Sequence, residues 1–386
     1  RETPRWRRRR IIYNNDGDEV FGAPPEFENS HDSTEALMTR TNGELIDDFL
    51  DARTTPVVGT QVDSIWYCSC SAGLTFSHHT KLGGFYGKGF TQQLIDTYDR
   101  DSLNIQVGFS HEREIESFWS LRMNDVHDST PEGTRRFTYG LAPFKRNHPE
   151  YMMGVPDDWE KYPNGPKHYW SALDFSYPEV RDHYFYLIQE VCEKYDVDGV
   201  ELDFLRHPCY FTPTLNGLPV EEQHLDIMTN FVRRVKKMTM DWGQRRGRPI
   251  LLAVRTPFTV SDARFIGLDL EKWLKADLFD ILIAGGLSES PITDSFKQIV
   301  DLGHQYNVPV YPCIKWGFWN YWAFLDLGSE KHRENGSWTK TLMSEEARRR
   351  NIPPFNVTLN AWEGTLATWR GAAMNLFNAG ADGIYT

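Results

Sequence analysis

The sequence predicts an α/β protein of the (β/α)8 TIM-barrel class. Short apolar runs rich in β-branched and aromatic residues alternate with amphipathic helical stretches along the chain, which is the pattern of parallel βα units. The length of 386 residues suits one such barrel with insertions, since these domains take about 200 to more than 400 residues. We therefore predict a single barrel domain over 1–386.

The apolar runs have the length and composition of strands. The predicted strands are 10–15, 64–68, 117–123, 199–204, 250–255, 280–284, 310–315 and 383–386. Helices are predicted over 41–52, 91–99 and 178–195, the last because Pro178 suits a first helical turn and apolar residues recur on one face.

Two stretches are too long for plain connections between strands. They are 124–174 after the third strand and 316–360 after the seventh, and both are predicted insertions. The eighth strand ends the sequence, so we expect a longer polypeptide with a further C-terminal domain.

Composition and charge exclude several classes of protein. A net charge of −12 argues against a nucleic-acid partner, because phosphate binding relies on clustered Lys and Arg. The longest apolar runs are strand-sized, so no membrane-spanning segment is expected. The basic stretch 1–10 is interpreted as a solvated end segment. The protein is expected to be soluble, and the sequence leaves open a cytoplasmic or a secreted or periplasmic location and a monomer or a homo-oligomer.

Cysteine usage predicts neither a disulfide framework nor a metal site. Five cysteines are few and odd in number, and Cys68 and Cys70 lack the CxxC spacing typical of zinc sites. No metal and no cofactor is expected. Aromatic residues make up 14% of the chain, a content that suits a cleft stacking on sugar rings and so a carbohydrate partner.

The predicted fourth strand carries two carboxylates. Side chains alternate between the faces of a strand, so Glu201 and Asp203 point into the barrel when Val200 and Leu202 face the helices. Charged residues at the C-terminal end of a barrel strand are typical of a catalytic mouth. The alternative is a buried structural pair tied to Arg206 or Arg255.

The end of the third strand concentrates polar residues of several kinds. Arg122, Asn124, Asp125, His127 and Asp128 combine groups for anion recognition with groups for proton transfer. Either of the two carboxylates could favour a protonated imidazole, which makes His127 a candidate acid.

Other positions are expected to face the same mouth. Asn14 and Asp16 end the first strand, and Asp16 is interpreted as a base or a substrate contact, because no calcium-loop spacing follows it. Arg255, Lys315 and Trp316 follow strands five and seven and could contact substrate or pack. His78 and His79 after strand two are interpreted as solvated loop residues.

The segment 195–208 looks like the fourth-strand signature of glycoside-hydrolase-like barrels. Chitinase-type barrels share its beginning, but Leu205 stands where they carry their essential glutamate. A chitinase is therefore not expected.

A closer resemblance is to the inverting exo-sialidases of glycoside hydrolase family 156, which are TIM barrels with a catalytic Asp and His. Asp16 matches the Asp at the end of strand one. Arg122 and His127 reproduce the five-residue spacing between a substrate-binding Arg and the His at strand three, and Arg206 corresponds to a second substrate arginine.

This resemblance implies an inverting exo-α-sialidase that releases sialic acid from a sialylated glycan. It implies Asp16 as base and His127 as acid, with the reverse assignment open. Arginines would hold the sugar's carboxylate by bidentate hydrogen bonds, and direct attack by water avoids repulsion between that anion and a carboxylate nucleophile. The predicted substrate-binding residues are Arg122, Arg206, Asn124, Asp125, Glu201, Asp203, Asn14, Arg255, Lys315 and Trp316.

Two alternatives stay open from the residues themselves. One is a glycosidase of neutral or uronic sugars that uses Glu201 and Asp203 as its catalytic pair. The other is a barrel that binds glycans without catalysis, since a fold alone does not establish activity.

Overall fold

The computed structural model describes residues 4–20, 44–87, 90–129, 141–155, 169–285, 293–314 and 366–386. Its main sheet has eight parallel strands in the order β10-β9-β8-β7-β6-β2-β1-β11. These strands are β1 (Ile11–Asn15), β2 (Val62–Tyr67), β6 (Glu116–Arg122), β7 (Gly199–Asp203), β8 (Leu251–Thr256), β9 (Ile281–Ala284), β10 (Val310–Pro312) and β11 (Ile384–Tyr385). They match the predicted strands to within a few residues.

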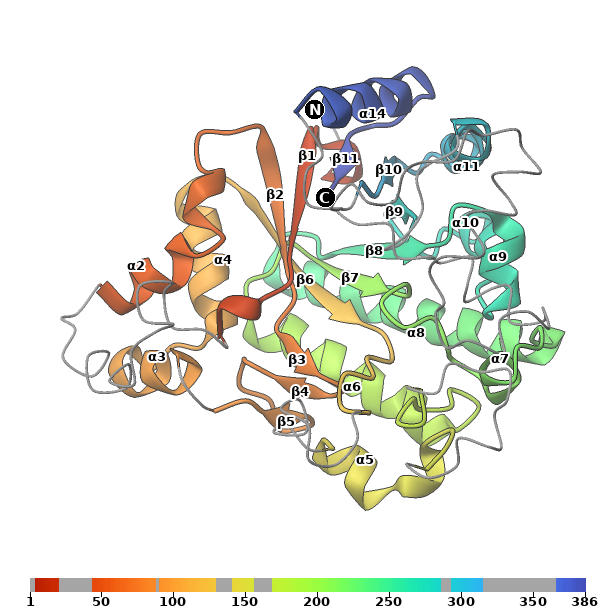
Figure 1. Ribbon diagram of the computed structural model, residues 1–386, viewed down its shortest axis with the longest axis horizontal. Coiled ribbons are helices and arrows are strands. Elements are labelled where there is room, and N and C mark those ends of the chain that lie inside the picture. Colours follow the sequence, from red (N-terminus) through yellow and green to blue (C-terminus); the bar gives the residue numbers. More distant parts are fainter. Residues whose placement is uncertain are drawn as a thin grey trace, which may run out of the picture.

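The sheet closes on itself between its first and last strands in that order. Cys313, directly after β10, forms a parallel bridge with Tyr385 of β11, and the Ile314 N–H donates to the Tyr385 carbonyl at 2.8 Å. Helices surround the strands in Figure 1. The predicted (β/α)8 TIM-barrel fold is therefore confirmed.

The helices follow the strands along the chain. They are α2 (Glu44–Asp51), α3 (Phe90–Tyr98), α4 (Ser102–Glu112), α5 (Pro143–Asn147), α6 (Pro178–Lys194), α7 (Thr212–Leu215), α8 (Glu222–Arg246), α9 (Val260–Phe265), α10 (Leu270–Lys275), α11 (Thr293–Gln305) and α14 (Leu366–Asn378). The predicted helix at 178–195 is confirmed, with Pro178 in its first turn and the predicted apolar face buried. None of the described helices has the length and apolarity that a membrane crossing requires.

Two additions lie beside the barrel on the side where its strands end. A small sheet of β3 (Cys70–Ala72), β4 (Thr75–Phe76) and β5 (Gly84–Phe85) follows β2. The predicted insertion after the third strand is present between β6 and α6 and contains α5. The second predicted insertion, 316–360, falls outside the described residues.

Apolar side chains fill the interior of the barrel. This cluster consists of Ile12, Trp66, Phe118, Leu251, Ala253, Ile281, Ile283, Tyr311, Cys313 and Tyr385. Trp66 and Phe118 stack with ring centroids 4.5 Å apart. Gly199 makes room for this stack, because a Cβ at that position would lie 2.2 Å from the Phe118 ring.

Polar side chains replace the apolar ones toward the C-terminal ends of the strands. Ser120, Glu201 and Ala253 pair across β6, β7 and β8, and two residues further on Arg122, Asp203 and Arg255 pair in the same way. Because side chains alternate along each strand, both rows point into the barrel. Val200 and Leu202 belong instead to the large core cluster that includes the helices, as predicted.

The basic N-terminal stretch is solvated only in part: Arg7 and Arg8 are exposed as predicted, but Arg9 and Arg10 are not. Arg9 is fully buried and holds Glu116 through two hydrogen bonds of 2.7 Å, while Arg10 pairs with Asp63 at 2.7 Å. These carboxylates stand at the N-terminal ends of β6 and β2. The arginines therefore help to close the end of the barrel opposite the candidate site.

The prediction of a solvated His78 is also wrong, whereas His79 is exposed as expected. His78 is buried beside Ser69, whose hydroxyl lies 2.7 Å from its Nδ1 atom. Burial lowers the pKa of His78 to about 4, so this histidine is a neutral packing residue.

Candidate active site

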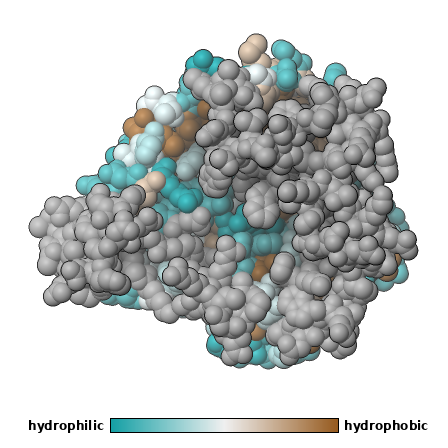
Figure 2. Space-filling view, viewed as in Figure 1, coloured by the Kyte–Doolittle hydropathy of each residue, from teal (hydrophilic) through white to brown (hydrophobic). Residues whose placement is uncertain are grey.

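The predicted catalytic and arginine residues gather where β1, β6 and β7 end. Asp16 follows β1, Arg122 ends β6, and Arg206 lies just beyond β7. Parallel strands end at one rim of a barrel, where TIM-barrel enzymes carry their active sites. Most of the coloured atoms visible near the centre of Figure 2 are hydrophilic.

Arg122 connects two carboxylates. Its Nη2 donates to Oδ1 of Asp16 at 2.6 Å, and its Nη1 lies 3.7 Å from Oδ2 of Asp125. The Arg122 side chain is only 5% exposed, whereas that of Asp16 is 33% exposed. Asp16 is therefore a carboxylate that solvent reaches and a buried guanidinium orients.

Asp125 fixes the imidazole of His127. Its Oδ2 lies 2.7 Å from Nδ1 of His127, and its Oδ1 accepts from the backbone N–H groups of Gly73 at 2.8 Å and His127 at 2.9 Å. Burial alone would raise the pKa of Asp125, but the hydrogen bond from His127 and the positive charge of Arg122 oppose it and hold that pKa well below the usual range. Asp125 is thus an anion that keeps a proton on Nδ1.

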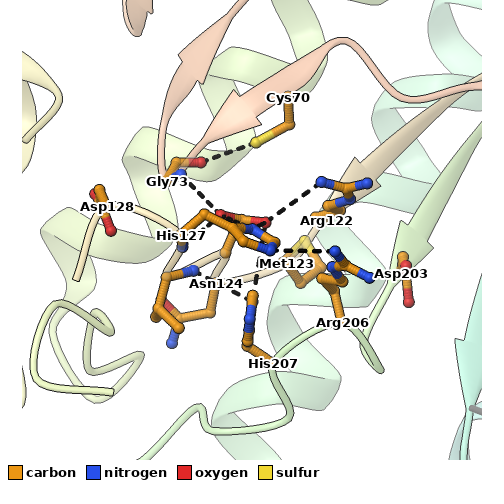
Figure 3. Close-up of polar contacts among 12 residues, drawn as sticks. Cys70, Gly73, Arg122, Met123, Asn124, His127, Asp128, Asp203, Arg206 and His207 are labelled. Carbon is orange, nitrogen blue, oxygen red and sulfur yellow. Dashed lines mark hydrogen bonds and ion pairs between the residues drawn. The ribbon is translucent and has the colours of Figure 1, made fainter. Parts of the chain in front are cut away.

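The other ring nitrogen of His127 faces Arg206. Nη2 of Arg206 lies 3.1 Å from Nε2 of His127 (Figure 3). A guanidinium can only donate, so Nε2 is the acceptor and His127 is the neutral tautomer with its proton on Nδ1. This arrangement orders Asp125, His127 and Arg206 in one chain of hydrogen bonds.

Arg206 has spare hydrogen-bonding capacity. Its Nε is buried and has no hydrogen-bond partner, and no carboxylate of the described residues forms an ion pair with its guanidinium. The residue as a whole is partly exposed, but a guanidinium N–H that is withdrawn from water without a partner is unfavourable. Arg206 is therefore a ready receptor for an anionic ligand.

His207 is a neighbour that sequence reasoning missed. Its Nδ1 accepts from the Val126 N–H at 3.2 Å, and its ring packs edge-on against His127 with centroids 4.8 Å apart. Burial lowers the pKa of His207 well below the usual range. The signal that could have found it is its place directly after Arg206 at the end of a barrel strand.

Asp125, His127 and His207 also come close enough together to resemble a metal triad. The backbone hydrogen bond already occupies Nδ1 of His207. Arg122 and Arg206 add positive charge beside the other two residues. The site is therefore better suited to an anion and to proton transfer than to a metal cation.

Asn124 and Asp128 organise the loop after β6. Asn124 has a φ of 60°, a conformation that Asn tolerates, and its amide group bonds the backbone of Leu173 and Cys209. Asp128 pairs with buried Lys145 at 2.9 Å and lies apart from the imidazole of His127 in Figure 3. Of the two carboxylates considered for His127, the structure brings only Asp125 into contact with it.

The remaining predicted residues lie deeper in the barrel. Asp203 pairs with Arg255 at 3.2 Å, and both are buried. Glu201 is fully buried, and its Oε2 accepts from Ser120 at 2.5 Å and Tyr385 at 3.0 Å. Asn14 joins this network through Ser120 at 3.3 Å. Lys315 and Trp316 fall outside the described residues.

The stability of the fold should depend on the proton of Glu201. Burial and the Asp203 carboxylate raise the pKa of Glu201 from 4.5 to about 8. The folded state keeps this proton while the unfolded chain releases it, so the contribution to stability is full below pH 4.5 and is lost as pH rises to about 8. We expect wild type to lose about 1.4 kcal/mol per pH unit in this window relative to Glu201→Gln.

Urea unfolding of both proteins at several pH values measures this difference. The exposed Glu271 on α10 provides a matched control, because Glu271→Gln should leave the pH dependence of wild type unchanged. A Glu201→Gln protein with the same slope as wild type would contradict a protonated Glu201.

This chain shows only distant similarity to known proteins. It matches no protein-family model and no curated protein. Among solved structures, it is similar to the PgaB (BpsB) glycoside hydrolase domain from Bordetella bronchiseptica, with 11% identity, a TM-score of 0.47, and coverage of 98% of this chain and 93% of that one. It is also similar to α-L-fucosidase isoenzyme 2 from Paenibacillus thiaminolyticus, with 14% identity, a TM-score of 0.46, and coverage of 82% and 42%.

A third similar structure is the β-N-acetylhexosaminidase from Bacteroides fragilis, with 11% identity, a TM-score of 0.39, and coverage of 80% of this chain and 50% of that one. This chain therefore spans half or less of the length of the fucosidase and hexosaminidase chains. Likenesses at this level carry no argument about reaction or substrate. The barrel assignment rests on the strand pairing, and any function rests on the site.

Proposed function

We propose that this protein is a glycoside hydrolase, specifically an inverting exo-α-sialidase. The observation that carries the proposal is Arg206, which has a free buried Nε and no carboxylate partner among the described residues, beside the imidazole of His127. A sialic acid bears a carboxylate on its anomeric carbon. Binding of that carboxylate to Arg206 would bring the glycosidic bond to the residues that move protons.

Asp16 and His127 suit the two proton transfers. Asp16 is accessible and is oriented by Arg122, so its carboxylate can take a proton from the attacking water. His127 can deliver a proton from Nε2 to the leaving oxygen, because Asp125 stabilises the imidazolium through Nδ1. The bond from the anomeric carbon to the leaving oxygen breaks as the bond to the water oxygen forms, which inverts the configuration.

The two arginines have different roles in this proposal. Arg122 already faces Asp16 and Asp125, so much of its charge is compensated. We infer that Arg122 mainly orients Asp16, and that Arg206 is the main receptor for the substrate carboxylate.

The alternative catalytic pair, Glu201 and Asp203, is less suitable. Glu201 is fully buried and protonated near neutral pH, and Asp203 is held by Arg255. Neither has the accessible ionised carboxylate that activates water. This supports a role for both as the polar floor of the site.

A substrate panel tests the proposal. Purified protein is offered 4-methylumbelliferyl α-sialoside and a set of neutral and uronic aryl glycosides, with an Asp203→Ala variant alongside. We expect cleavage of the sialoside alone, and proton NMR should show the β-anomer as the first-formed sugar. Turnover of neutral or uronic glycosides alone, lost in Asp203→Ala, would sink the proposal, and so would glycan binding without any turnover.

A further inference from the structure

His127 cannot act as an acid in the arrangement that the structure shows. Its Nε2 accepts a hydrogen bond from Arg206 at 3.1 Å, and its only ring proton is on Nδ1, facing Asp125. An acid needs a proton on Nε2, where the leaving oxygen would lie. Arg206 and such a proton would compete for the same place, since both are donors.

The charges that face His127 come from several elements. Asp125 lies on its Nδ1 side. Nη1 of Arg122, at the end of β6, lies 3.7 Å from Oδ2 of Asp125. Arg206 and the neutral ring of His207, both after β7, cover the other side. Arg206 is therefore the cation in direct contact with Nε2, and it is the group that opposes an imidazolium there.

We propose that Arg206 makes the protonation of His127 depend on the substrate's carboxylate, and so determines specificity for anionic sugars. This inference rests on the proposed function of the site. A carboxylate that binds the free Nε and a terminal nitrogen of Arg206 draws the guanidinium from the imidazole. The released Nε2 then takes one proton from solvent, because the bound anion compensates Arg206 and Asp125 holds Nδ1.

This coupling selects anionic over neutral sugars at the proton-transfer step as well as at binding. A neutral sugar that fits the site leaves Arg206 on Nε2 and meets a histidine without an acidic proton. A bound sugar carboxylate instead releases Nε2 of His127, which takes a proton from solvent before the glycosidic bond breaks. Arg206 thus links recognition of charge to the ability to protonate the leaving oxygen.

The test is an equilibrium measurement that needs no turnover. Protein labelled with ¹⁵N-histidine is studied by NMR at about pH 6, with N-acetylneuraminic acid as the ligand and its uncharged methyl ester as control. The chain has 12 histidines, and a His127→Gln spectrum identifies the signals of His127. Arg206→Gln removes the charge but keeps a donor, and Arg206→Lys restores the charge.

In wild type, we expect Nε2 of His127 to change from an unprotonated to a protonated nitrogen when the acid binds, and not with the ester. In Arg206→Gln, Nε2 should be protonated without ligand, and Arg206→Lys should return it toward the wild-type state. Calorimetry in buffers of different ionisation enthalpy should record uptake of about one proton per acid bound in wild type and about none in Arg206→Gln. The exposed Arg233→Gln serves as a matched control and should behave as wild type.

Two results would overturn the coupling. One is an Arg206→Gln protein whose Nε2 remains unprotonated as in wild type, and the other is saturating acid that leaves wild-type Nε2 unprotonated. A protein that fails to bind the acid contradicts the proposed function instead. The ligand-free comparison of wild type with Arg206→Gln still decides the coupling in that case.

Discussion

Asp16→Asn is expected to lower kcat for an α-sialoside by about 10²–10⁴ with little change in KM. The amide has the size of the carboxylate and still offers an oxygen to Nη2 of Arg122, which lies 2.6 Å from Asp16 in wild type. It cannot accept the proton of an attacking water. The loss should therefore appear in the chemical step rather than in binding.

Steady-state kinetics with 4-methylumbelliferyl α-sialoside measures this change. Asp301→Asn is a matched control, because Asp301 is exposed on α11 and pairs only with Lys297 among the described residues. The control should retain wild-type kcat. An Asp16→Asn enzyme within about threefold of wild type would exclude Asp16 as the base.

The alternation of side chains along the predicted strands correctly indicated which residues face the interior near the rim of the barrel. Alternation along β7 placed Glu201 and Asp203 inside the barrel, and the register with β8 confirms this by pairing Asp203 with Arg255. Strand positions follow from a local period of two residues, so the sequence contains the necessary information. The strand ends are then brought to one rim by the parallel topology.

Features that depend on distant partners were not predictable in the same way. Arg9 was interpreted as solvated, but its partner Glu116 is 107 residues away in the sequence. The helix α4 was missed because the polar residues Ser102, Gln106 and Ser110 lie among its buried residues, so its sequence shows no apolar stripe with a helical period.

Several contacts of the candidate site also come from residues that are distant in the sequence. A short spacing predicted that Asp125 or Asp128 would interact with His127, and Asp125 does. The contacts that decide the tautomer and the free charge come from Gly73 after β2 and Arg206 after β7. These three loops meet only in the folded barrel, so the sequence suggested the groups but not which nitrogen of His127 each would face.

His127→Ala should show a loss of activity that depends on the leaving group. A sugar leaving group needs a proton as its bond breaks, so cleavage of sialyllactose should fall by about 10²–10⁴. The 4-methylumbelliferyl group leaves as a stabilised anion and needs little help, so the loss with that substrate should be about tenfold or less. Asp16→Asn should instead slow both substrates to a similar extent, because water must be activated whichever group departs.

Kinetics with both substrates therefore assign acid and base. His79→Ala provides the control, since His79 is an exposed histidine whose ring packs on Phe85, and it should retain both activities. If Asp16→Asn showed the leaving-group dependence and His127→Ala did not, the two roles would be reversed. That reversal would fit the ligand-free tautomer, in which Nε2 is already unprotonated, and would remove the need for Arg206 to release it. The leaving-group series thus discriminates between a histidine that gains its acidic proton only after the substrate's carboxylate binds Arg206 and one that is ready to act as a base.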